Sequence, residues 1–148
     1  MQKLHFSIQI NSPREKVWKT MLDDKTYREW SAMFMPGSHF VGAWDKGSKI
    51  QFLAPDENGQ MGGITSEVVE SRPHEFISTK HLGLVTAGVE DTTSKKAKEW
   101  VGFENYTFTD LGGKTELLVD VNTTDDFKDY MSDTWPKALQ KLKELAEK

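Results

Sequence analysis

Residues 125–148 have the sequence DDFKDYMSDTWPKALQKLKELAEK, in which apolar side chains recur at steps of three and four residues. This spacing places them on one face of a helix, so we predict a long amphipathic C-terminal helix that covers a core. Pro136 lies inside the pattern, and its ring would clash with the carbonyl group of Ser132. We therefore expect a kink or a restart of the helix near 132–136. The apolar face consists of Phe127, Tyr130, Met131, Trp135, Ala138, Leu139, Leu142 and Leu145.

The N-terminal segment predicts a strand followed by two short helices. From Leu4 to Ile10, apolar and polar residues alternate, as they do in a strand with one buried face. Ser12 can then cap a helix, and Glu15 can complete a capping box. A second short helix follows and carries Tyr27 and Trp30 inward.

The middle of the chain has turn signals at the spacing that is typical of an antiparallel meander. Turn signals rich in Gly, Pro, Asp and Asn separate six runs that are typical of strands, at 39–44, 48–54, 61–71, 74–82, 100–110 and 114–123. The interval 83–99 is a long polar exception, which we interpret as a lid loop with one helical turn from Ser94 to Lys98.

Together these elements predict an α+β fold of the helix-grip type in a single domain over residues 1–148. A seven-stranded curved antiparallel sheet would hold the long C-terminal helix on its concave face. The two short helices would follow strand one. A bent sheet wrapped around one long helix seldom closes completely, so we expect the two to enclose a cavity.

Composition excludes several classes of function. The chain has no cysteine, so it has neither disulfides nor thiolate metal sites, and we expect a cytoplasmic location. No apolar run approaches the roughly 20 residues that span a bilayer, so membrane insertion is not expected. Because 19 basic and 23 acidic residues are scattered along the chain and give a net charge of -4, the basic field of a nucleic-acid-binding protein is missing.

Three short motifs resemble a known family by their order and spacing. They are SPREKVW at 12–18, GGKT at 112–115 and WPKALQKLK at 135–143. The chain resembles the SRPBCC superfamily of START-like and birch-pollen-allergen-like helix-grip proteins. Within it, the chain resembles the branch of the C-terminal domain of the activator of the ninety-kilodalton heat-shock-protein ATPase. The resemblance implies a fold and a cavity, but no single activity and no cofactor.

Large rings must fill much of the interior, because the chain has 5 Trp and 8 Phe but only 36% hydrophobic residues. These rings can form a pocket that binds by stacking and burial, or they can simply pack as core. Strand alternation and the helix face together predict the following cavity lining: Trp30, Phe34, Phe52, Ile64, Phe76, Trp100, Glu104, Tyr106, Phe108, Leu117, Val119, Met131, Trp135 and Leu139.

Glu104, Tyr106 and His81 are the candidates for polar chemistry. If Phe108 faces the cavity, so do Tyr106 and Glu104, and a buried carboxylate must be paired or hold a proton. That would make Glu104 a ligand anchor or a general acid. Alternatively, an irregularity before Tyr106 turns Glu104 to solvent and Val101 and Phe103 inward.

His81 and Lys80 have alternatives of their own. His81 lies in the cavity only if Ile77 and Thr79 face inward, and the opposite face of that strand, with Phe76, fits equally well. Lys80 could pair with Glu104 or be solvated. The other histidines, His5, His39 and His74, are not at ligand spacing, so no metal site is expected.

Three hypotheses for the function remain open. The first is a binding protein that encloses a hydrophobic or amphipathic, lipid-like or polyketide-like small molecule without catalysis. The second is a cyclase- or dehydratase-like enzyme in which Glu104, Tyr106 or His81 moves protons. The third, implied only by the resemblance, is a co-chaperone-like module whose partner is a chaperone.

Overall fold

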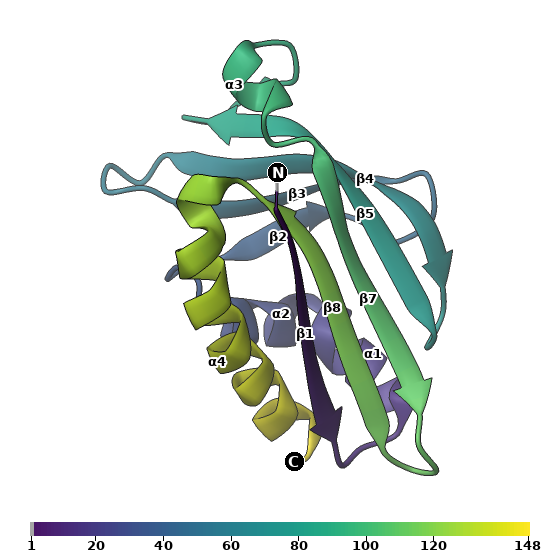
Figure 1. Cartoon of the computed structure of the whole chain (residues 1–148). Coiled ribbons are helices and arrows are strands. Elements are labelled where there is room, and N and C mark those ends of the chain that lie inside the picture. Colours follow the sequence, from purple (N-terminus) through teal and green to yellow (C-terminus); the bar gives the residue numbers. More distant parts are fainter. Residues whose placement is uncertain (1) are drawn as a thin grey trace.

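A curled antiparallel sheet and the long C-terminal helix form the two main layers of the protein (Figure 1). The computed structural model describes residues 2–148. The sheet order is β1-β8-β7-β5-β4-β3-β2, with β6 paired to β5 beside this path. The strands are β1 (Gln2–Ile10), β2 (His39–Gly42), β3 (Lys49–Pro55), β4 (Met61–Arg72), β5 (Phe76–Thr86), β6 (Val89–Asp91), β7 (Gly102–Asp110) and β8 (Thr115–Thr123).

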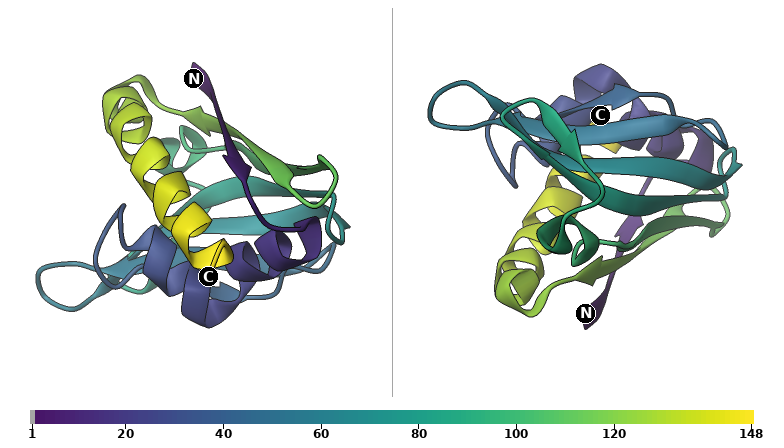
Figure 2. Two further views of the ribbon diagram at one scale, coloured as in Figure 1. Left: turned by 90° about the horizontal axis from the view of Figure 1, so that it is seen from below. Right: turned by 90° about the horizontal axis from the view of Figure 1, so that it is seen from above.

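Two short helices and the long helix lie on the concave side of the sheet, which confirms the α+β helix-grip prediction (Figure 2). The long helix contacts both short helices and β1. The helices are α1 (Arg14–Leu22), α2 (Asp24–Ser31), the single turn α3 (Lys95–Lys98) and α4 (Lys128–Ala146), which follows a 3₁₀ turn (Asp125–Phe127).

The core lies between the sheet and the C-terminal part of α4. The buried residues of α4 begin only at Thr134, whereas most of its first turns are exposed. The helix therefore seals the core with one half and leaves its other half over a more open region. Fully buried core residues include Val17, Met21, Trp30, Ile50, Val68, Ile77, Phe108, Leu117, Val119, Ala138 and Leu142.

Two expectations about the helices can be compared with the structure. Of the kink or restart expected near 132–136, the restart does not occur, because α4 is continuous through Pro136. Ser132 and Pro136 are both exposed, so water can satisfy the carbonyl group that loses its partner. The predicted capping box is also absent, because α1 starts from Pro13 without a side-chain cap, and Ser12 is buried with its carbonyl oxygen accepting a hydrogen bond from Thr115.

The interval 83–99 is more ordered than the predicted loop. β5 continues to Thr86, and β6 returns beside it as an eighth strand. Ala87 and Gly88 join them, and both have the positive φ of a type I′ turn. The helical turn predicted from Ser94 is confirmed as α3, with the Ser94 hydroxyl accepting a hydrogen bond from the Ala97 N–H at 3.1 Å.

Two bulges change the pairing of β4 with β5. Ser66 pairs with His81 but Thr65 pairs with Gly83, so Leu82 is an extra residue in β5. This bulge keeps both His81 and Leu84 on the concave face, although they are three residues apart. The second bulge lies between Val68 and Glu70.

Candidate functional site

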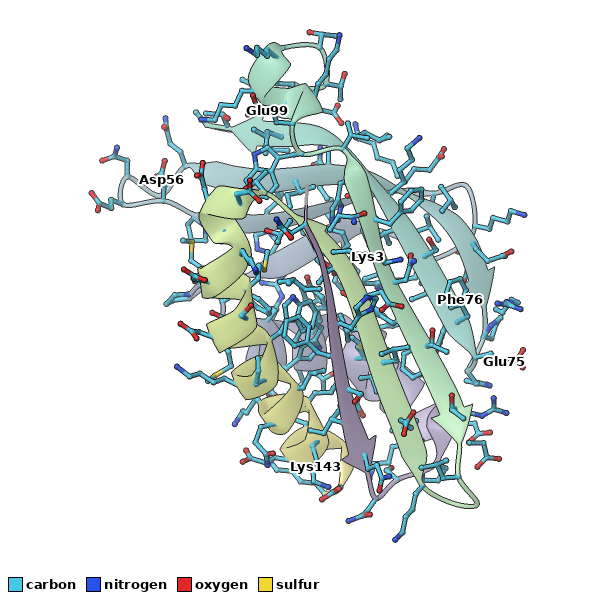
Figure 3. All side chains as sticks on the ribbon, in the orientation of Figure 1. Lys3, Asp56, Glu75, Phe76, Glu99 and Lys143 are labelled. Carbon is cyan, nitrogen blue, oxygen red and sulfur yellow. The ribbon has the colours of Figure 1, made fainter. Side chains whose placement is uncertain are left out.

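A cleft of about 460 Å³ opens above the sealed core, between the sheet, α2 and the N-terminal half of α4. This volume lies in the range of small-molecule pockets, roughly 300–1,000 Å³. Asp56, in the hairpin between β3 and β4, is at its rim on the side of α4 (Figure 3). The lining consists of Tyr27, Trp30, Ser31, Phe34, Met35, Ser38, His39, Phe52–Asp56, Gly62–Ile64, Leu84, Trp100, Glu104, Phe127, Tyr130, Met131 and Trp135.

Aromatic rings form the inner wall of the cleft. Tyr27 of α2 meets Trp30 edge-on at 4.9 Å between ring centroids and stacks with Phe52 of β3 at 6.2 Å. Trp135 of α4 lies 6.0 Å from Trp30 and 4.9 Å from Phe34. Because these rings come from the sheet and from two helices, the wall is fixed by the packing of the fold itself.

Four polar side chains form a cluster in the concave face beside this wall. Glu104 Oε2 accepts a hydrogen bond from the Tyr106 hydroxyl group, and its Oε1 lies 3.8 Å from His81 Nε2. The other ring nitrogen of His81, Nδ1, is 2.7 Å from Ser66 Oγ. The polar cluster thus runs from Ser66 through His81 and Glu104 to Tyr106.

Regular strand pairing places the Glu104 side chain on the concave face of the sheet. Glu104 is opposite Thr79 of β5 and Val121 of β8, and Tyr106 is opposite Val119. The ladder between β7 and β8 has no irregularity, so these residues share the concave face. The alternative with an inward Val101 and Phe103 is wrong, because these side chains are 40% and 42% exposed.

The cluster is mostly shielded from water. The His81 side chain is 5% exposed, whereas that of Glu104 is 15% exposed and lines the cleft. Lys80 is opposite Glu67 and Phe103 on the convex face, so it does not pair with Glu104. Glu104 is therefore the member of the cluster that a molecule in the cleft would meet.

Burial raises the pKa of the Tyr27 and Tyr106 hydroxyl groups well above the usual value. The negative charge of Glu104 contributes to both shifts, since it opposes a second negative charge nearby. Both phenols are therefore held in the neutral form, and Tyr106 keeps the proton that it donates to Glu104.

We expect the protein to lose stability steeply above pH 10. There an unfolded tyrosine loses its proton but a buried one keeps it, so folding stability decreases by about 1.4 kcal/mol per pH unit for each buried tyrosine. Urea unfolding between pH 9 and 11 should show this slope. Tyr27→Phe and Tyr106→Phe should each reduce it, and Tyr130→Phe should reduce it less, because partial burial raises the pKa of the Tyr130 hydroxyl group to a smaller extent. An unchanged slope in both buried variants would contradict the assignment.

Several predicted lining residues lie together in the cleft. They come from α2, the segment after it, β3, β4, β7, α4 and the segment that follows α3. The structure therefore assembles them from elements that are far apart in the sequence. They are Trp30, Phe34, Phe52, Ile64, Trp100, Glu104, Met131 and Trp135.

The remaining predicted lining residues lie elsewhere. Phe76 is wrong in direction. It is opposite Thr107 on the convex face, where the Arg72 guanidinium lies 5.1 Å from the centre of its ring. It is the first residue of β5, at the strand end far from α4 (Figure 3). The others face inward but lie below the cleft in the sealed core: Tyr106, Phe108, Leu117, Val119 and Leu139.

The mouth of the cleft was not identified from the sequence. Leu53, Pro55 and Asp56 belong to a hairpin, and Met35 and Ser38 to an irregular segment, so no periodicity points to them. Phe127 and Tyr130 could have been recognised, because both belong to the apolar face predicted for the C-terminal helix. In the structure they remain partly exposed.

A second hollow of about 360 Å³ adjoins the cleft and shares several of its lining residues. Trp100 and Phe127 line both, with ring centroids 4.9 Å apart. Lys96, Glu99 and Asp126 give this hollow a polar wall. The segment around α3 thus meets the start of α4 at the boundary between the two hollows.

The curled sheet, the gripping helix and the cleft define a helix-grip protein of the SRPBCC type. The family model for "Activator of Hsp90 ATPase homolog 1-like protein" matches residues 11–147, so the chain belongs to this family. No curated protein matches the chain significantly.

Solved structures share the fold at low sequence identity. The Aha1 dimer from Colwellia psychrerythraea is 20% identical, covers 99% of this chain and 97% of its own, and has a TM-score of 0.71. Protein CV1439 from Chromobacterium violaceum is 18% identical over 100% and 99% of the two chains, with a TM-score of 0.69. Protein MLL2253 from Mesorhizobium loti is 17% identical over 97% and 96%, also with a TM-score of 0.69. At these identities the similarity shows the fold alone.

Residues 2–148 contain neither a cluster of metal-ligand side chains nor a helix suited to crossing a bilayer. Within residues 2–148, no three His, Asp or Glu side chains gather as metal ligands would. None of the helices in that range combines the length and the apolar character that crossing a bilayer requires.

Proposed function

We propose that the protein binds a hydrophobic or amphipathic small molecule in the cleft between the sheet and α4, and that it acts as a binding protein. The observation that carries this proposal is the cleft of about 460 Å³ itself, which remains open beside a closely packed core. Its aromatic wall offers area for apolar burial, which favours binding by about 25 cal/mol per Å². Glu104 would position a polar group of the ligand.

A neutral fluorescent naphthalene, N-phenyl-1-naphthylamine, tests the proposal directly. We expect its emission to increase and shift to shorter wavelength when it enters the cleft, and Trp30 and Trp135 to be quenched. Native mass spectrometry of the purified protein should also detect any molecule that it retains.

A larger side chain inside the cleft should block this binding. Ile64 is on the concave face of β4, opposite Phe52 and Leu84, and lines the cleft. We expect Ile64→Trp to weaken probe binding at least about tenfold, because it fills the volume that the probe needs. Glu67→Trp, on the convex face of the same strand, is the matched control and should bind normally. Equal binding by both variants would place the probe elsewhere.

A second candidate, proton-transfer catalysis, is favoured by one observation. Glu104 reaches the cleft with His81 3.8 Å behind it and Ser66 behind His81, so a proton removed by Glu104 has acceptors nearby. If a retained molecule changes mass during incubation with the wild-type protein but not with Glu104→Gln, the enzyme hypothesis is supported. A molecule recovered unchanged from both supports simple binding. The co-chaperone alternative rests on the description of the family alone.

A further inference from the structure

The charged side chains in the lining of the cleft have one sign. Glu104 and Asp56 are both carboxylates, and within residues 2–148 no Lys or Arg belongs to the lining. His39 also lines the cleft, but it is cationic only when protonated, so a ligand with a carboxylate or a phosphate would meet no Lys or Arg inside the cleft. It would instead lose its hydration beside acidic groups.

One oxygen of Glu104 accepts no hydrogen bond from any residue in the range 2–148. Oε2 accepts from Tyr106, but Oε1 lies 3.8 Å from His81 Nε2, which exceeds the normal N–H···O distance of about 3.2 Å or less. Among the ion pairs of the described residues, His81 is the only cationic group that faces Glu104, and it is charged only when protonated. An acceptor thus remains open at the point where Glu104 reaches the cleft.

The rings beside Glu104 are suited to a positive charge. Phe52 and Tyr27 line the cleft together, and Trp30 lies 4.9 Å from Tyr27 between ring centroids. The face of an aromatic ring carries partial negative charge and attracts an ammonium group, most strongly where water is excluded. Rings and carboxylate therefore favour the same kind of head group.

We infer that the cleft selects amphipathic small molecules with a protonated amine head group and an apolar, preferably aromatic, body over equally sized molecules with an acidic head group. This inference rests on the proposed function, because it assigns a ligand class to the same cleft. In the complex, the ammonium donates a charge-assisted hydrogen bond to Glu104 Oε1 and lies against the rings, while the body fills the apolar volume. A neutral alcohol retains the hydrogen bond but not the charge.

Three probes that differ only in the head group test this selection. They are 1-naphthylmethylamine, 1-naphthalenemethanol and 1-naphthoic acid, titrated into the wild-type protein at pH 7 by isothermal calorimetry. We expect the amine to bind about tenfold or more tighter than the alcohol, because only the ammonium carries a positive charge that the carboxylate and the ring faces attract. We expect the acid to bind weakest, because its charge has the same sign as that of the lining carboxylates.

The Glu104→Gln variant isolates the contribution of the carboxylate. The amide has nearly the same shape but no charge, so we expect amine binding to weaken about 10- to 100-fold and alcohol binding to weaken much less. Alcohol binding by the variant also shows that the cleft is still formed. If the variant does not fold, the order of the three probes on the wild-type protein still decides the inference.

The possible outcomes separate this inference from the proposed function. If none of the three probes binds, the proposed function loses its support. If the alcohol binds but the acid binds as tightly as the amine, the cleft binds ligands without the selectivity inferred here. If Glu104→Gln retains the full preference for the amine, Glu104 is not the group responsible, and the inference is wrong.

Discussion

Replacing Trp135 with alanine is expected to lower the free energy of unfolding by about 3–5 kcal/mol. Such a loss is a large part of the roughly 5–15 kcal/mol that stabilises an ordinary domain. We therefore expect the variant to unfold at a much lower urea concentration than the wild-type protein, or to accumulate in insoluble form.

This large loss is expected because Trp135 lies where α4, the sheet and the segment after α2 meet. Its ring is 2% exposed and lies 4.9 Å from Phe34, 6.2 Å from Phe6 of β1 and 6.2 Å from Tyr106 of β7. Truncation removes these contacts at once and leaves a hole that opens into the cleft, because the ring also lines it. The sheet and α2 would lose the side chain that ties them to α4.

Two variants sharpen this prediction. Trp135→Phe keeps a ring and removes an indole N–H that is buried without a hydrogen-bond partner in the described structure, so its cost should be clearly smaller. Trp100→Ala removes an equally large side chain at the partly exposed boundary between the hollows, and we expect it to cost less than about 1 kcal/mol. Similar losses for Trp100→Ala and Trp135→Ala would refute the central role of Trp135.

The sequence predicted the layers of this protein because their signals are local and regular. The alternation from Leu4 to Ile10 and the three- and four-residue steps after Asp125 each fix one buried face without reference to the rest of the chain. The long C-terminal helix, the two short helices and most of the strands followed from such patterns.

The direction of the polar residues could not be settled in the same way. Both faces of β5 carry apolar and polar side chains, and the bulge at Leu82 interrupts the alternation. Only pairing with β7 and β4 places His81 on the concave face, and Phe76 consequently on the convex one. Glu104 depended on the same long-range register, which a single strand does not contain.

The cleft was harder to predict than the core. Its inner wall follows from the alternation of strands and the helix face, but its mouth is formed by the β3–β4 hairpin and by the segment after α2. The prediction also included Phe108 and Leu139, which pack in the sealed half. Periodicity identifies the inward face of an element but not the point along it where packing ends.

The backbones of β3 and β4 approach each other closely at Gly63, which leaves no room for a side chain there. Gly63 has a φ of +154°, and a Cβ atom built there would lie 1.9 Å from the carbonyl oxygen and 2.9 Å from the carbonyl carbon of Phe52. These are backbone atoms within the β3–β4 ladder, so no flexible side chain can move aside. Gly63→Ala must therefore separate the two strands locally.

We expect Gly63→Ala to lower the free energy of unfolding by about 3 kcal/mol or more, since it combines backbone strain with loss of strand pairing. It should also disturb the cleft, because Phe52 and Ile64 line it from the strands that would separate. Urea unfolding measures the first effect, and binding of N-phenyl-1-naphthylamine measures the second.

Gly62 and Gly59 serve as controls, because they distinguish the cost of a steric clash from the cost of an unfavourable backbone conformation. A Cβ atom at Gly62 would meet only the Val85 carbonyl oxygen at 3.4 Å, so Gly62→Ala should be close to wild type in both measurements. Gly59 has a φ of +77° but no atom within 4 Å of a Cβ, so Gly59→Ala should show the cost of left-handed backbone alone, about 1 kcal/mol. The expected order of destabilisation is therefore Gly62→Ala, then Gly59→Ala, then Gly63→Ala. If Gly63→Ala cost no more than Gly59→Ala, the two strands would not approach as closely as the structure requires. The positions of Phe52 and Ile64 in the cleft wall would then be wrong.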